Sequence, residues 1–252
     1  MIIAENFIYL ELHKTGSTHL RKLFKDNFDI SIIGKHNSIF EVFRDSSNEV
    51  LKSKLIFGSI RNPFTWYLSL WAYGCNSKGH LFNLKTKISR KNIFNLKLRE
   101  LKNWKRVYSD VNNPIYFHGW LKMVMEFSEK DANNLTFNNI SLDKNVGFMT
   151  KRFLDIYYNF NEKDNFINNN MKIDNLKKRL VVNYFFSQEN LVQDFKRLIK
   201  NNLNNPKRTL IIDNSFSNST KKNKSDFYYN DESIELVSKH DSILLDTFKY
   251  KF

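Results

Sequence analysis

Cysteine, proline and glycine are all scarce in this chain: one cysteine, three prolines and seven glycines in 252 residues. A single cysteine cannot close an internal disulfide, which excludes a secreted disulfide framework and favours a reducing compartment. Cys75 also lacks the partner spacing of a zinc site, so we interpret it as a small core residue. The hydrophobic content of 41% indicates neither a disordered nor a fibrous chain.

Long hydrophobic runs are missing as well. The apolar run at 7–12 is far too short to cross a membrane, and it contains Glu11. The start of the chain has neither a basic n-region nor a small-residue cleavage site. We therefore expect a cytoplasmic protein with no membrane span.

Acidic residues are outnumbered, 26 against 40 Lys and Arg, which gives a net charge of +14. Such a field attracts anions such as nucleotides, acidic glycans, nucleic acids or membrane surfaces. The chain is also rich in Lys, Asn, Ile and Phe together, a composition that an AT-rich genome produces by itself, so the charge has two explanations. Its aromatic residues fall in core-like periodic segments instead of interleaving with basic ones, and we expect no nucleic-acid partner.

Apolar runs alternate with segments of helical spacing along the chain. This alternation predicts one α/β domain over 1–252, with a central, mostly parallel sheet flanked by helices. Pro63 suits the first turn of the helix that follows the third strand. The expected strands lie at 7–12, 30–33, 54–60 and 179–186, and the expected helices follow Thr18 and lie at 38–44, 63–74, 92–104, 114–129, 145–158, 188–201 and 231–248.

The first candidate site is the loop at 13–18, between the opening strand and its helix. Backbone N–H groups at a helix N-terminus favour an anion, and Gly16 allows close backbone approach. Lys14 adds a full positive charge, and Thr15, Ser17 and Thr18 add hydroxyl donors. The loop is not a Walker A motif, because Lys14 precedes the only glycine. It is therefore predicted to hold a phosphate or phosphosulfate.

The second candidate site follows the strand at 54–60. Arg61 leaves the strand tip, and Ser69 lies eight positions later, about 9 Å along the axis of the intervening helix. A guanidinium fork and a short hydroxyl can converge on one anion from these positions.

Both segments resemble PAPS-dependent sulfotransferases (PAPS, 3′-phosphoadenosine 5′-phosphosulfate). The first is similar to their 5′-phosphosulfate loop, with His13 in place of the usual proline, and 58–69 resembles their Arg–Asn–Pro…Ser segment. Further likenesses lie at 66–75, 146–153, 188–191 and 228–252. The resemblance implies a P-loop-type three-layer fold, a 3′-phosphate site at Arg61 and Ser69, and PAPS as co-substrate without a metal.

The resemblance also implies the remaining roles. His36 follows the second strand, as does a proposed base in carbohydrate and bacterial sulfotransferases, while Glu11 and His13 are its competitors. Lys14 would stabilise the leaving phosphate. His19 would contact the phosphosulfate or cap packing, and Ser219 and Lys222 in a late basic loop would contact the nucleotide, unless that loop is only a solvated charge run.

Two rival functions stay open: a kinase-like enzyme on a similar scaffold, and a non-enzymatic polyanion-binding protein. The sequence has neither a Walker A loop nor a convincing acidic partner for Mg²⁺, which argues against a kinase. We expect sulfuryl transfer to a hydroxyl or amine of a small-molecule or glycan acceptor, anionic ones included. Neither the acceptor nor the oligomeric state is predicted.

Overall fold

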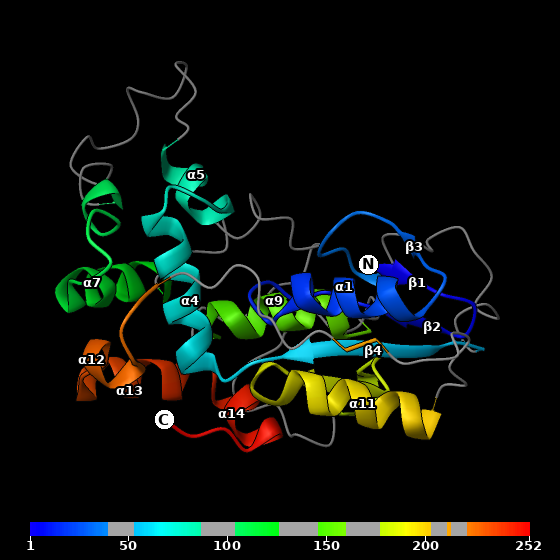
Figure 1. Cartoon of the computed structure of the whole chain (residues 1–252). Coiled ribbons are helices and arrows are strands. Elements are labelled where there is room, and N and C mark those ends of the chain that lie inside the picture. Colours follow the sequence, from blue (N-terminus) through cyan, green and yellow to red (C-terminus); the bar gives the residue numbers. More distant parts are fainter. Residues whose placement is uncertain (40–52, 87–103, 126–145, 160–176, 203–210, 213–220) are drawn as a thin grey trace, which may run out of the picture.

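The structure is a computed structural model that describes residues 1–39, 53–86, 104–125, 146–159, 177–202, 211–212 and 221–252 (Figure 1). Within these ranges no helix combines the length and the apolar character needed to cross a membrane. The helices predicted at 38–44 and 92–104 fall almost entirely outside the described residues, so their outcome is open.

A five-stranded mixed sheet forms the centre, in the order β3-β1-β2-β4-β5. β2 pairs with β4 and β4 with β5 in parallel, as predicted, while β1 is antiparallel to both β2 and β3. The strand expected at 30–33 is therefore present, but a strand that the sequence did not suggest separates it from β2. The strands are β1 (Ile2–Ile3), β2 (Phe7–Tyr9), β3 (Ser31–Ile32), β4 (Leu55–Ile60) and β5 (Tyr184–Ser187).

Helices cover both faces of this sheet (Figure 1). Phe7, Tyr9 and Phe57 pack with the apolar side chains of α1 (Ser17–Asn27) and α11 (Leu191–Asn202). Ile8 and Ile56 point to the opposite core, which α4 (Pro63–Cys75) and α9 (Phe148–Tyr157) share. Burial on both faces explains why the strands are apolar at consecutive positions. The α/β class with a parallel centre is thereby confirmed.

The remaining helices mostly follow the predicted segments. Asn62 caps α4 by accepting from the Phe64 N–H at 3.0 Å, and Pro63 occupies its first turn as expected. α5 was not predicted, because its segment has weak periodicity. These helices are α5 (His80–Thr86), α7 (Pro114–Met125), the 3₁₀ turn η2 (Gln188–Asn190), α12 (Ser225–Tyr228), α13 (Asp231–His240) and α14 (Ser242–Phe248).

The single helix predicted at 231–248 is wrong, because the chain breaks into α13 and α14 at Asp241. This fully buried carboxylate accepts from the Tyr67 hydroxyl (2.7 Å) and from the backbone N–H and hydroxyl of Thr150 (2.9 and 2.7 Å). A buried charge must be compensated by hydrogen bonds. Through these hydrogen bonds, Asp241 connects the closing helices α13 and α14 to α4 and α9.

Candidate functional site

The loop between β2 and α1 curls through two left-handed residues, Lys14 (φ 61°) and Gly16 (φ 83°). A Cβ at Gly16 would lie 2.4 Å from Leu191 Cδ1, so only glycine fits. Gly16 is the N-cap of α1 and provides no side-chain cap. The N–H groups of His19 and Leu20 already donate to the Gly16 carbonyl, at 3.0 and 3.1 Å. The amides at the very start of α1, those of Ser17 and Thr18, are therefore the ones suited to an anion.

Thr15, whose hydroxyl the sequence predicted as a donor to a ligand, packs inside the loop. Its side chain is fully buried, and its hydroxyl donates to the Leu12 carbonyl at 2.7 Å. That commits its proton, so Thr15 accepts from Ser59 Oγ (2.6 Å), which in turn accepts from the Tyr9 hydroxyl (2.8 Å). The hydroxyl of Thr15 is thus used within the protein, and only its backbone can serve a ligand.

Arg61 meets the loop at the carboxyl end of β4. Its Nε donates to Thr65 Oγ1 at 2.8 Å and its Nη1 to the Lys14 carbonyl at 3.1 Å. Burial, with Arg61 and Lys222 nearby, lowers the pKa of Lys14 to about 8. Burial likewise lowers the pKa of Arg61 to about 10, although Glu189 and Tyr250 oppose the shift. Burial and Arg61 lower the pKa of Lys222. Three cations therefore converge at the start of α1.

The other residues expected to contact the nucleotide differ in how far they are exposed to solvent. Ser69 is 9% exposed on α4, and its hydroxyl forms no hydrogen bond with any described residue. Ser17 is half-buried and Thr18 exposed in the first turn of α1. His19 is 3% exposed and both its ring nitrogens are shielded from solvent, so a direct ligand contact is not supported. Ser219 lies outside the described residues.

His36 contacts the residues at the start of the loop. Its Nδ1 is 2.9 Å from the carbonyl oxygen of Glu11. A carbonyl only accepts, so the neutral ring carries its proton on Nδ1 and leaves Nε2 as a proton acceptor. Burial lowers the pKa of His36, which favours this neutral form, while the contact to Glu11 opposes the shift. Both the tautomer and the charge state suit a general base.

Glu11, the competing base, is engaged elsewhere. Its carboxylate is 1% exposed, pairs through both oxygens with the Arg21 guanidinium, and accepts from the N-terminal ammonium of Met1 at 2.8 Å. Burial alone would raise its pKa, but these hydrogen bonds outweigh burial and lower it. The carboxylate does not line the cavity described next, and the geometry favours His36 over it.

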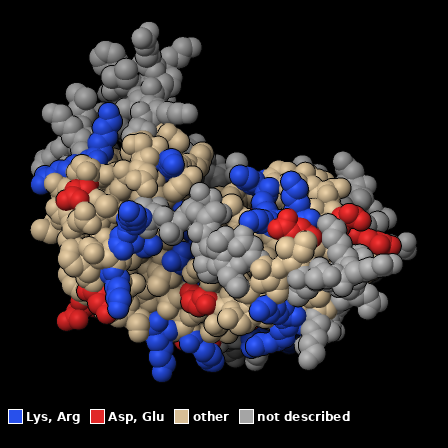
Figure 2. All heavy atoms as spheres, viewed as in Figure 1, with Lys and Arg blue, Asp and Glu red and all other residues tan. Residues whose placement is uncertain are grey.

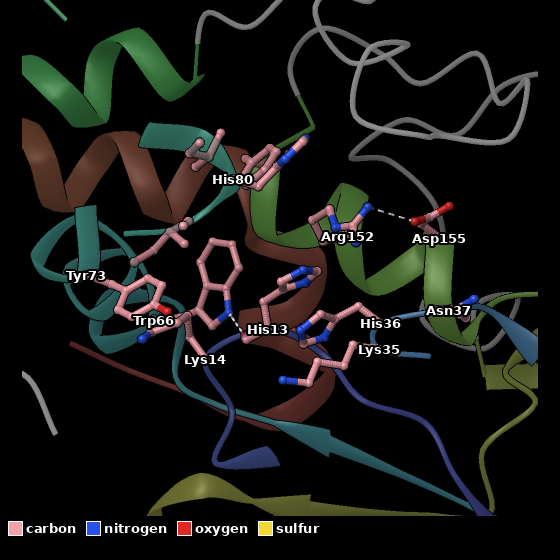
Figure 3. Close-up of a pocket in the computed structure, with 14 residues that line it drawn as sticks. His13, Lys14, Lys35, His36, Asn37, Trp66, Tyr73, His80, Arg152 and Asp155 are labelled. Carbon is pink, nitrogen blue, oxygen red and sulfur yellow. Dashed lines mark hydrogen bonds and ion pairs between the residues drawn. The ribbon is translucent and has the colours of Figure 1, made fainter. Parts of the chain in front are cut away.

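A cavity of about 500 Å³ opens beside the loop (Figure 3). Lys14 and His36 both line it, and Lys14 Nζ sits 4.0 Å from the centre of the Tyr73 ring. Arg152 lines it too, paired with Asp155 at 2.9 Å. The sequence did not single out most of the other lining residues, which are His13, Lys35, Asn37, Trp66, Leu70, Gly79, His80, Leu81 and Phe148.

The face of the molecule drawn in Figure 2 shows the basic excess of the composition. Lys and Arg are spread over the face in Figure 2, while Asp and Glu form a few separate groups. Among the residues that the structure describes, no three His, Cys, Asp or Glu side chains are grouped so that they could hold a metal ion. No family model, curated protein or solved structure matches the chain.

Proposed function

We propose that this protein transfers a sulfuryl group from PAPS to an acceptor hydroxyl or amine, on a P-loop-type three-layer fold. One observation carries the proposal. Lys14 joins two sites: its carbonyl accepts from Arg61 within a cluster of three cations, and its side chain lines the cavity that also contains His36. An anionic donor held by the cations would thereby have its reacting end next to the cavity.

On the donor side, the cations and the first-turn amides of α1 supply charge and hydrogen bonds for phosphate and phosphosulfate groups. We assign Arg61 and Ser69 to the 3′-phosphate of the nucleotide. Two observations support this assignment. Arg61 is held by hydrogen bonds at the tip of β4, and Ser69 has an uncommitted hydroxyl on the following helix. The 3′-phosphate distinguishes PAPS from ATP, so this pair would determine cofactor choice.

The chemistry then divides between two residues. His36 Nε2 accepts the proton of the acceptor as the acceptor oxygen or nitrogen bonds to sulfur. The bond from sulfur to the bridging oxygen breaks, and its electron pair stays on the 5′-phosphate of adenosine 3′,5′-bisphosphate. The Lys14 ammonium stabilises the charge that develops there, which is the moment at which its contact is strongest.

The acceptor would enter the cavity beside His36. Its walls combine aromatic rings, among them Trp66 and Tyr73, with the cations Lys35 and Arg152. Such walls suit a compact ring-bearing acceptor, either a small molecule or a glycan unit, and tolerate an anionic substituent. Screening acceptors with labelled PAPS identifies the class directly.

Thermal unfolding with nucleotides tests the donor. Adenosine 3′,5′-bisphosphate at 100 times its Kd should raise the Tm by roughly 5–10 °C, whereas AMP and ATP at equal concentration should raise it far less. In the Arg61→Ala variant, the bisphosphate should raise the Tm no more than AMP and ATP do. Preferential stabilisation by ATP with Mg²⁺ would instead support a kinase-like enzyme, and no response to any nucleotide would favour a polyanion-binding protein.

A further inference from the structure

The ring of His13 lies flat against the ring of His36, with 3.5 Å between centroids and 19° between planes (Figure 3). His13 occupies the position just before Lys14, where the resembling loops have proline. Its ring packing is therefore a particular feature of this chain. Van der Waals contact at this separation leaves no room for water between the two rings.

His13 is itself held in place. Its carbonyl accepts a 2.6 Å hydrogen bond from the Trp66 indole of α4. Its Nδ1 is buried without a hydrogen-bond partner among the described residues. This nitrogen does not tie the ring into a polar network, so the ring acts on its neighbour mainly through its face.

His36 therefore has two constraints. The hydrogen bond from Nδ1 to the Glu11 carbonyl fixes one edge of the ring, and the His13 face fixes its plane. Together they determine the direction of Nε2, the atom that accepts a proton in the proposed reaction. We propose that His13 is a positioning residue that holds the His36 ring parallel to its own and keeps the His36 ring neutral. This inference rests on the proposed function.

The charges around the pair support a neutral state. Two protonated rings at this distance would repel each other strongly. Burial, followed by His36 and the nearby cations, lowers the pKa of His13 far below its usual range. The Glu11 carboxylate is the opposing charge, and Arg21 neutralises it. The charged or titratable groups that face the pair are Glu11, Lys14, Lys35, Arg152 with Asp155, His80, Arg21 and the Met1 ammonium.

Two variants separate ring packing from histidine chemistry. His13→Phe keeps a flat ring, and His13→Ala removes it and admits water. The first measurement is the pKa of His36 by NMR titration of the imidazole C–H signals, assigned with His36→Ala. Less desolvation should bring the pKa of His36 up toward its ordinary value in His13→Ala, while His13→Phe should keep it low.

The second measurement is single-turnover sulfuryl transfer from PAPS. His13→Ala should lower the rate by roughly 10- to 100-fold, as misplacement of a reacting group does, with unchanged nucleotide affinity, and His13→Phe should recover most of it. The rising limb of the pH–rate profile should move to higher pH only in His13→Ala.

The two readouts fail in different ways. If PAPS transfer is absent but the pKa of His36 responds as expected, the proposed function is wrong and the stacked pair stands. If the wild type transfers sulfuryl groups while His13→Ala keeps both its rate and its His36 pKa, the positioning role is wrong. A fall in Tm for His13→Ala, with both readouts unchanged, would show that the ring only contributes packing.

Discussion

Removing the guanidinium of Arg61 should weaken binding of 3′-phosphorylated nucleotides selectively. Charged hydrogen bonds contribute roughly 1.5–3 kcal/mol each, so Arg61→Ala should raise the Kd of adenosine 3′,5′-bisphosphate about 10- to 200-fold. Nucleotides without the 3′-phosphate should change little. The side chain also holds the loop through the Lys14 carbonyl, which adds a smaller loss common to both classes.

Isothermal titration calorimetry with the bisphosphate and with AMP measures both losses on one protein. Arg197→Ala is the matched control, because it removes the same charge from a side chain that is 65% exposed on α11. Loss of this half-buried cation should also raise the pKa of Lys14 above about 8, since Arg61 contributes to lowering it. If Arg61→Ala weakens both nucleotide classes equally, Arg61 does not bind the 3′-phosphate.

Activity should survive EDTA, because the cationic cluster supplies the charge that a metal would; loss on chelation that Mg²⁺ restores would contradict this. The pH profile of kcat/KM should be bell-shaped. Its acid limb lies below the ordinary histidine pKa, because His36 must be neutral, and its alkaline limb lies near 8, where Lys14 loses its proton. His36→Ala should lower the rate by roughly 10²–10⁴-fold and Glu11→Gln should retain a histidine-limited profile; an inactive, folded Glu11→Gln beside an active His36→Ala reverses the assignment. Thr15→Val should destabilise the fold by about 1–3 kcal/mol in chemical denaturation, as unpaired buried groups do, whereas exposed Thr18→Val should not.

The sequence predicted correctly those elements whose structure depends on neighbouring residues. The strand, glycine loop and helix around Gly16, and the Asn62–Pro63 start of α4, appear as predicted because each depends on neighbouring residues. β1 was missed because two isoleucines carry no periodicity, and their strand is defined only by pairing with β2 and β3.

The cavity, too, could not be predicted from local sequence patterns. Its lining residues Trp66, Arg152 and His80 come from three helices, and periodicity identifies such residues as helical or buried without showing what they face. The sequence indicated His13 as a departure from a motif and as a competing base, but not as a stacking partner of His36. Its stacking partner follows it by more than 20 positions and is reached through β3, so no local pattern connects the two rings.

Two contacts account for the left-handed conformation of Lys14. With φ at 61° its carbonyl reaches the Arg61 guanidinium while its ammonium lies over the Tyr73 ring. Left-handed backbone is strained for a lysine, and two contacts on opposite ends of the residue hold it there. The Tyr73 contact also restricts a flexible side chain before any ligand binds. Burial keeps the pKa of the ammonium near 8. In the proposed reaction, a phosphate that gains charge would therefore meet a poorly solvated cation that is already in position.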